Sequence, residues 1–286
     1  MSETTGKSEP AVGHSHEEYV CLLDALAARV AHPTNLQKHE FRSNLMGDAR
    51  ELVVYCPPGY DDNEQQRYPV LYLQDGQNLF DATTAFIPGM DWKVDETAET
   101  LILEKAVQPV IIVGIYNAGE QRIGEYTPTR DPKLGGGRAD LYGRMLVEEL
   151  KPFIDREYRT LPDAENTGLG GSSLGGLVTM FLGLRHPDVF RRLAVISPSV
   201  WWSRRAIVAS VRRLKCKLPL RIWVDIGTEE GDAHVANAKL LRDALAEKGW
   251  VEGEDLRYTE IPGATHTEAA WAERVSPVLR YLFPAA

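Results

Sequence analysis

A serine flanked by glycines is the feature that most constrains what this chain can fold into. The run Gly171-Ser172-Ser173-Leu174-Gly175 fits the pattern G-x-S-x-G, and the apolar stretch 176–184 follows it. A serine at the tip of a sharp strand-to-helix turn has a strained backbone, and glycines two residues away let strand and helix approach without a clash. The first amides of the helix then face the hydroxyl. The pattern predicts an exposed, reactive Ser173; the alternative is a glycine-rich structural turn.

Short apolar runs alternate with helical patterns on both sides of this turn. This alternation predicts an α/β fold with a mostly parallel central sheet and helices on both faces. Before it, residues 39–45 and 49–56 are typical of an antiparallel hairpin that turns at 46–48. No second domain is visible, so 36–286 is predicted to be a single domain. We expect strands at 70–73, 110–116, 167–171, 193–196, 220–226 and 256–261, and helices at 94–106, 141–158 (with Pro152 dividing it), 174–185, 204–214, 233–248 and 267–282.

Residues 1–35 fall outside that pattern. A polar tail precedes apolar residues at helical spacing over 17–31, which predicts a short amphipathic helix that either packs on the domain or bridges a homodimer. The chain shows no secretory signal and no apolar run of the ~18–20 residues that cross a membrane. Its three cysteines, Cys21, Cys56 and Cys216, form neither a disulfide framework nor a zinc pattern. We therefore expect a cytoplasmic protein without membrane contact.

The charge is unevenly distributed along the chain. A net charge of −9 argues against nucleic acid as a general partner. The segment 185–221 nevertheless holds eight arginines and two lysines against a single acid, Asp188. Two explanations are open: solvated helix faces, or a basic rim beside the reactive serine that attracts an anionic substrate.

A serine hydroxyl needs a base to become a nucleophile, and the base needs an orienting acid. Where a serine lies on such a turn, the acid and then the histidine follow it along the chain. Of the seven histidines, three follow Ser173. His186 ends a helix and His234 opens one, whereas His266 lies on a glycine-containing loop after the last strand, where open parallel sheets bind ligands. We expect His266 to be the base, with a helix N-cap as the alternative.

The acid should come from the loop after strand 220–226. Asp225 lies within that strand, and Glu229, Glu230 and Asp232 follow it. Spacing alone does not separate Glu229, Glu230 and Asp232.

Two backbone amides should bind the negative charge that develops on a substrate carbonyl oxygen. The first belongs to Leu174, directly after the nucleophile. The second should come from Gln74-Asp75-Gly76-Gln77-Asn78, after the strand 70–73, where Gln77 can present its amide. The alternative is an ordinary Asp-Gly turn.

With these features assembled, the chain resembles the esterase D-like family of α/β hydrolases over about 39–283. This family includes enterochelin and bacillibactin esterase-like enzymes, carbohydrate esterases such as feruloyl esterases, and mycolyltransferases. The segments that carry the resemblance are 68–81, 114–117, Arg122, 125–128, 149–155, the serine pentapeptide, Ser197-Pro198-Ser199-Val200-Trp201-Trp202 and Gly227-Thr228-Glu229-Glu230.

The resemblance implies an α/β-hydrolase fold and a serine carboxylic-ester hydrolase that works through an acyl-enzyme. In this family the acid tends to stand three residues after the glycine, which selects Glu230 and implies the triad Ser173, Glu230 and His266. No metal or organic cofactor is required. Mycolyltransferases act outside the cell, and the missing signal weighs against that branch.

The substrate-binding candidates are Asp75, Arg122, Trp201 and Trp202. Neighbouring side chains after a strand point apart, so we expect one tryptophan in the core and the other in a pocket wall. A pocket tryptophan beside Arg204 and Arg205 would suit an aromatic, anionic ester such as a catecholate siderophore; sugar and other aromatic esters are also considered. An acyltransferase with the same triad and a non-catalytic binding protein of the same fold are the alternatives.

Overall fold

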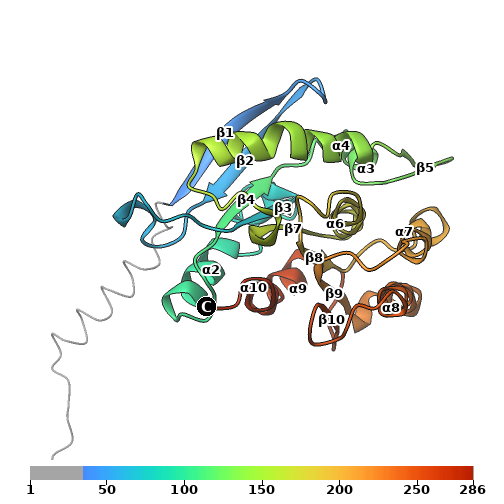
Figure 1. Cartoon of the computed structure of the whole chain (residues 1–286). Helices are drawn as coiled ribbons and strands as arrows, with labels where there is room; N and C mark the ends of the chain where they lie inside the picture. Colours follow the sequence, from blue (N-terminus) through green and yellow to red (C-terminus); the bar gives the residue numbers. More distant parts are fainter. Residues whose placement is uncertain (1–34, 286) are drawn as a thin grey trace, which may run out of the picture. The chain divides into compact units, whose positions relative to one another are not determined.

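An eight-stranded sheet forms the centre of the computed structural model, which describes residues 35–285 (Figure 1). The strand order is β1-β2-β4-β3-β7-β8-β9-β10. The β1–β2 and β2–β4 pairs are antiparallel and the others are parallel. The strands are β1 Leu36–Ser43, β2 Asp48–Tyr55, β3 Val70–Gln74, β4 Ile111–Ile115, β7 Thr167–Ser172, β8 Arg192–Ile196, β9 Arg221–Gly227 and β10 Leu256–Ile261, with a separate ribbon of β5 Arg130–Asp131 and β6 Gly135–Gly136.

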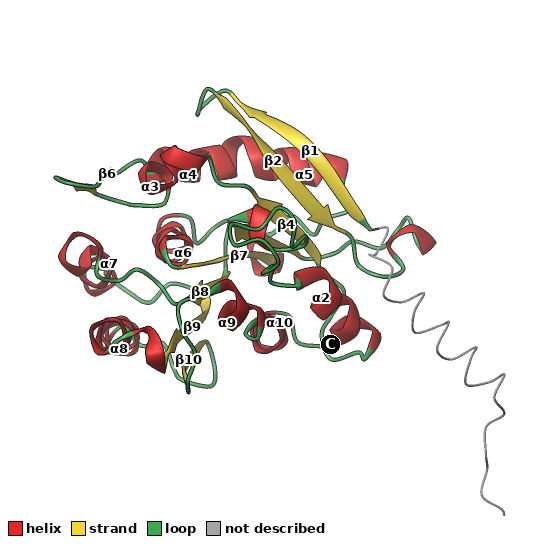
Figure 2. Cartoon of the chain, turned by 180° about the vertical axis from the view of Figure 1, so that it is seen from behind, coloured by secondary structure: helices red, strands yellow, loops and turns green. Residues whose placement is uncertain are grey.

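Helices cover both faces of this sheet (Figure 2). One layer consists of α4 Ala139–Met145, α5 Lys151–Glu157, α6 Leu174–Arg185, α7 Trp202–Arg212 and α8 Asp232–Glu247, and the other of α2 Val94–Leu103, α9 Glu268–Ala272 and α10 Val275–Leu282. The short α3 Arg122–Glu125 follows β4. Among the helices of residues 35–285, none has the length and hydropathy needed to cross a bilayer.

The central strands are buried on both faces because their side chains alternate between two cores. In β4, Ile111 and Val113 pack in the core beneath α4–α8, whereas Ile112 packs in the core beneath α2 and α10. In β3, Tyr72 and Leu71 divide in the same way. This double burial explains why these strands are continuous apolar runs in the sequence.

The predicted α/β class, the mostly parallel sheet and the N-terminal antiparallel hairpin are confirmed. The hairpin pairs Ser43 with Asp48, so its turn is close to the predicted position. The amphipathic helix predicted at 17–31 lies outside the described residues. The single-domain boundary at residue 36 remains a prediction.

Prolines interrupt two of the predicted helical segments, the first as predicted and the second against the prediction. The segment 141–158 divides into α4, a π-helical turn Leu146–Leu150 and α5, because Pro152 has no N–H to continue the hydrogen-bond ladder. The single helix predicted at 267–282 is wrong. It breaks between α9 and α10, because the Pro277 ring would clash with the carbonyl of residue 273 in a continuous helix. The break places Arg274 between the two helices.

Candidate active site

Ser173 lies on the turn between β7 and α6 in a strained backbone conformation. Its φ of 57° and ψ of −119° lie outside the regions that L-residues favour, which costs about 1–3 kcal/mol. The neighbouring β8 region stabilises the turn, because the Ser173 N–H donates to Ile196 O at 3.0 Å and its carbonyl accepts from Ser199 N at 3.0 Å. A Cβ on Gly171 would approach the backbone of Gly175 to 3.0 Å. The glycines therefore permit the close strand–helix approach predicted from the pentapeptide.

His266 comes from the loop after β10 and lies beside the serine. Its Nε2 is 3.0 Å from Ser173 Oγ. The ring packs edge-on against Trp271, with the ring centroids 4.8 Å apart. With its proton on Nδ1, the imidazole can accept the Ser173 proton at Nε2.

Glu230 lies on the opposite side of the imidazole, in the short helical turn after β9. Its Oε2 accepts from His266 Nδ1 at 2.7 Å, and its Oε1 accepts from Gly227 N at 2.8 Å and Ser197 Oγ at 2.6 Å. Burial raises the pKa of Glu230, but the hydrogen bonds from His266, Ser197 and Gly227 outweigh it and lower the pKa to about 2. The Glu230 side chain is only 1% exposed, yet these hydrogen bonds keep its carboxylate ionised at neutral pH.

The low pKa of Glu230 predicts a contribution to stability that is lost in acid. An acid whose pKa is depressed on folding stabilises the protein above its unfolded pKa near 4.5, and this contribution disappears as the pH falls towards 2. Between pH 6 and pH 3 it should decrease by about 2 kcal/mol. Urea unfolding at both pH values should show a smaller loss for Glu230→Gln than for wild type. An equal loss in the two proteins would contradict the assignment.

The other acid candidates lie elsewhere. Glu229 and Asp232 are exposed, whereas Asp225 is fully buried and pairs with Arg274, whose Nη1 donates to Asp225 Oδ1 at 2.7 Å. The same Arg274 atom donates to Ser197 Oγ at 2.5 Å, and Nη2 donates to Glu230 Oε1 at 3.3 Å. Arg274 and Ser197 therefore hold the carboxylate that faces His266. Sequence reasoning assigned no role to either residue: Ser197 stood only within a segment that carries the family resemblance, and the signal near Arg274 was the proline three positions after it.

The loop after β3 packs closely on β4 before it reaches the serine. A Cβ on Gly76 would approach the Gly114 carbonyl carbon to 2.5 Å, so only glycine fits there. Gln77 follows and lines the same cavity as Ser173, and its side-chain Oε1 accepts from Asn117 N at 3.4 Å. Leu174 begins α6, where the first backbone N–H groups have no intrahelical acceptor. Oxyanion binding by the Gln77 and Leu174 amides remains a prediction.

Two cavities meet at Ser173 and His266. The larger, about 710 Å³, is lined among others by Asp75, Arg122 and Trp271. The smaller, about 540 Å³, is lined among others by Trp201, which is 41% exposed.

Of the four substrate-binding candidates, three line a cavity. Asp75 and Arg122 belong to the larger one and Trp201 to the smaller. Trp202 is in the core, where its indole N–H donates to Thr129 O at 3.0 Å, and it lines neither cavity. Placing Trp202 among the substrate-binding residues is therefore wrong, although one buried and one exposed tryptophan is the expected division.

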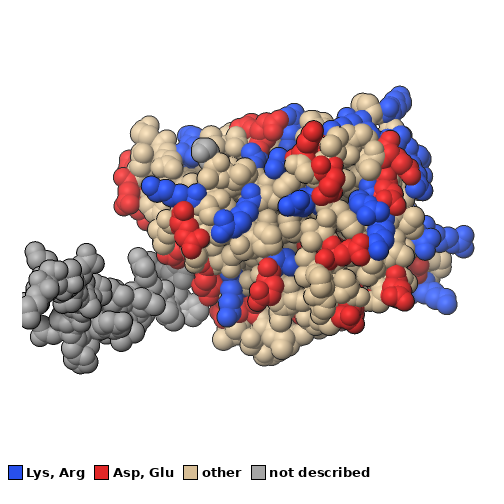
Figure 3. Space-filling model, turned by 90° about the horizontal axis from the view of Figure 1, so that it is seen from below, with Lys and Arg blue, Asp and Glu red and all other residues tan. Residues whose placement is uncertain are grey.

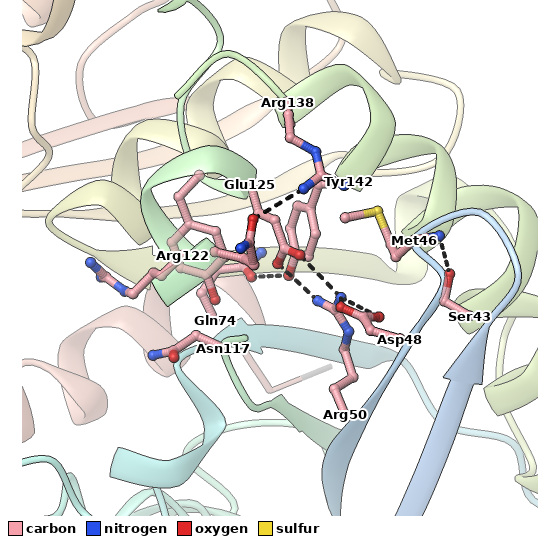
Figure 4. Close-up of polar contacts among 12 residues, drawn as sticks. Ser43, Met46, Asp48, Arg50, Gln74, Asn117, Arg122, Glu125, Arg138 and Tyr142 are labelled. Atoms are coloured by element: carbon pink, nitrogen blue, oxygen red, sulfur yellow. Dashed lines mark hydrogen bonds and ion pairs between the residues drawn. The ribbon is translucent and has the colours of Figure 1, made fainter. Parts of the chain in front are cut away.

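Arg122 reaches the larger cavity from α3 and forms a bidentate ion pair with Asp75 there. Its Nε and Nη2 donate to the two Asp75 carboxylate oxygens at 2.7 and 2.8 Å. At the other end of α3, Glu125 accepts from Arg50 of β2 at 3.0 Å, and both side chains are 1% exposed (Figure 4). Because an unpaired buried charge is costly, this pair fixes α3 to the hairpin and so positions Arg122.

The basic segment 185–221 does not form a rim around the serine. Arg192 and Arg221 begin β8 and β9, at the end of the sheet opposite to Ser173, and donate to backbone carbonyls near the end of α10. Arg212 pairs with Glu247. Arg205 is close to the smaller cavity, since its Nε donates to Asn237 Oδ1 at 2.6 Å. Figure 3 shows a face on which both charge signs are interspersed. Most of the segment is therefore solvated or paired surface.

Comparison with known proteins adds independent findings. The sequence model of the Esterase family, described as "Putative esterase", matches residues 43–282. The uncharacterized protein YbbA of Bacillus subtilis is 27% identical over 247 residues, covering 82% of this chain and 92% of that protein. The ferri-bacillibactin esterase BesA of Bacillus subtilis is 31% identical over 157 residues, covering 49% of this chain and 51% of that protein.

A solved structure shows the same fold. The IroE-like serine hydrolase from Shewanella oneidensis superimposes with a TM-score of 0.71 at 23% identity, covering 87% of this chain and 80% of that one. The likeness extends over most of residues 35–285, so the arrangement of strands and helices is that of the α/β-hydrolase fold.

Proposed function

The chain belongs to the Esterase family and is a carboxylic ester hydrolase, and from this premise we propose that Ser173, His266 and Glu230 perform the reaction through an acyl-enzyme. The observation that supports the assignment most directly is the continuous series of hydrogen bonds through His266. Its Nε2 is 3.0 Å from Ser173 Oγ and its Nδ1 is 2.7 Å from Glu230.

The first step forms the acyl-enzyme. His266 Nε2 takes the Ser173 proton as Oγ attacks the ester carbonyl carbon, and the resulting oxyanion accepts from the Leu174 and Gln77 amides. The imidazolium then gives its proton to the leaving alcohol as the C–O bond breaks. Glu230 stabilises the positive imidazolium and keeps the ring in the required tautomer.

The second step releases the acid. Water enters, His266 takes its proton, and the hydroxide oxygen attacks the acyl carbon; collapse of the intermediate returns the proton to Ser173. An alcohol acceptor in place of water would make the same residues an acyltransferase.

Ser173 lines two cavities, which favours an ester with a sizeable group on both the acyl and the alcohol side. The exposed Trp201 offers a flat apolar surface for an aromatic or sugar ring. BesA, which shares 31% identity over part of the chain, is described as a ferri-bacillibactin esterase. These features support siderophore, sugar or other aromatic esters as the substrate class.

A panel of p-nitrophenyl esters from acetate to octanoate tests the hydrolase and its acid together. Wild type should hydrolyse the series, and Glu230→Gln should lower kcat by roughly 10³–10⁴-fold, because the amide no longer stabilises the imidazolium or fixes its tautomer. The matched control is Glu229→Gln, the same change on the exposed neighbour, which should stay within about two-fold of wild type.

The outcomes separate the alternatives. Equal losses of kcat in Glu230→Gln and Glu229→Gln would contradict the assignment of Glu230 as the acid that orients His266. Product diverted by added alcohols would indicate an acyltransferase. A wild-type protein that neither hydrolyses any ester nor reacts with a fluorophosphonate probe would contradict a nucleophilic Ser173 and favour a binding protein.

A further inference from the structure

The larger cavity contains a carboxylate that the proposed reaction does not use. Glu268 is the first residue of α9, two positions after His266, and is 8% exposed. It lines the cavity together with Ser173 and Trp271. Within the described range 35–285, no hydrogen bond or ion pair to the Glu268 carboxylate is present. Neither Glu268 oxygen is among the fully buried unsatisfied atoms of residues 35–285, so the carboxylate is open to the cavity and free to accept from a bound molecule.

The neighbouring polar side chains of the cavity are already engaged within the protein. Asn78 Oδ1 accepts from Phe86 N at 2.8 Å, and Thr84 Oγ1 donates to Gln77 O at 2.8 Å. Asn117 Nδ2 donates to Asp75 Oδ1 at 2.7 Å. Glu268 is therefore the strongest acceptor that this cavity offers to a bound molecule.

Glu268 also sets the charge of the cavity. Burial lowers the pKa of Arg122, but Asp75 and, more weakly, Tyr126 and Glu268 raise it above its ordinary value, so Arg122 stays charged. Two short hydrogen bonds already pair Arg122 with Asp75. Because these two charges cancel, Glu268 leaves the cavity with one net negative charge.

We propose that Glu268 is a specificity-determining residue that makes the larger cavity select an ester bearing a hydrogen-bond-donating group, an ammonium or a hydroxyl, and reject one bearing a carboxylate there. The inference rests on the proposed function, since the cavity is a substrate site only if Ser173 is the nucleophile. The apolar walls at Ile87 and Trp271 bind the carbon framework, and Glu268 accepts from its donor group.

Substituted phenylboronic acids test this inference. Boron accepts the Ser173 oxygen as His266 takes its proton, which forms a tetrahedral adduct beside both cavities. Four substituents of similar size are compared, in the meta and para positions: methyl, hydroxymethyl, aminomethyl and carboxyl. Inhibition constants are expressed relative to the methyl compound within each variant, so that general effects on the serine cancel. The variants are wild type, Glu268→Gln and the control Glu273→Gln, an exposed glutamate that lines neither cavity.

In wild type the aminomethyl or the hydroxymethyl compound should bind about ten-fold more tightly than methyl, the gain typical of a hydrogen bond to a charged group, and the carboxyl compound more weakly. Glu268→Gln should reduce the aminomethyl advantage to about two-fold and restore carboxyl binding, whereas Glu273→Gln should resemble wild type. If only the aminomethyl compound binds more tightly than methyl, the preferred group is an ammonium. If the aminomethyl and hydroxymethyl compounds both do, the cavity selects any hydrogen-bond donor.

The inference is overturned if wild type shows no preference for either donor, or if Glu268→Gln keeps the wild-type preference. In both cases the methyl compound would still inhibit, and ester hydrolysis would still stand. Failure of every boronic acid, together with no ester hydrolysis by wild type, would instead overturn the proposed function.

Discussion

Ser173→Ala is expected to lower kcat for p-nitrophenyl ester hydrolysis by roughly 10⁴–10⁶-fold, because no other described hydroxyl is within hydrogen-bond distance of His266 Nε2. The residual rate would come from oxyanion stabilisation and substrate binding alone. The variant should fold, since alanine meets the same backbone strain as the serine it replaces. Steady-state kinetics and a thermal unfolding curve for the purified variant measure both properties.

Ser199 provides the matched control for that substitution. Its Oγ is 3.3 Å from Ser173 Oγ, and it lines the smaller cavity. Ser199→Ala removes the same atom from almost the same place, yet should lower kcat by less than about ten-fold, because within residues 35–285 the imidazole is hydrogen-bonded to Ser173 and Glu230 and not to Ser199. If Ser199→Ala were the inactive variant and Ser173→Ala remained active, the nucleophile assignment would be wrong.

The second large effect is on stability. Arg274→Met is expected to reduce the free energy of unfolding by about 3–5 kcal/mol, because it leaves Asp225 as an uncompensated charge in the core. Asp225 is 0% exposed, and the donors that would remain for its carboxylate are the Trp223 indole N–H and the Ser197 backbone N–H. Burial already raises the pKa of Asp225, so the deficit should be largest near neutral pH and smaller in acid, where the carboxylate takes up a proton.

Urea unfolding of a double-mutant cycle measures this effect. Arg274→Met with Asp225→Asn should recover part of the loss, since the second change removes the unpaired charge. Arg280→Met is the control: Arg280 lies in the same helical region, but its pair with Glu104 is exposed, at 3.7 Å, and should contribute less than about 1 kcal/mol. Equal losses for Arg274→Met and Arg280→Met would show that the buried pair does not stabilise the fold.

The fold was predictable to the extent that local patterns determine it. Strands such as 70–73 and 256–261, and the helix 174–185, agree with the structure because the length and spacing of apolar residues indicate which segments are buried. The points at which helices are interrupted were harder to predict from the sequence. Pro152 and Pro277 were visible, but whether a proline breaks a helix or is accommodated by a π-turn depends on the packing around it.

The sequence by itself located the candidate residues whose positions follow from backbone geometry. Ser173 was identifiable because a strained turn requires glycines at fixed offsets, and His266 because it follows the last strand of a parallel sheet. Both signals extend over a few residues, so they can be read without knowledge of distant partners.

Only the tertiary structure decided which polar side chains meet. Glu229, Glu230 and Asp232 are equivalent in spacing, and it is the position of the turn after β9 that brings Glu230 to His266. The pairs Arg274–Asp225 and Arg50–Glu125 join segments that are far apart in the chain. Glu268, which has no hydrogen-bond partner within residues 35–285, lines a cavity formed by several distant segments. No local pattern encodes such contacts, because charge pairing and burial depend on how the sheet and the helix layers pack together.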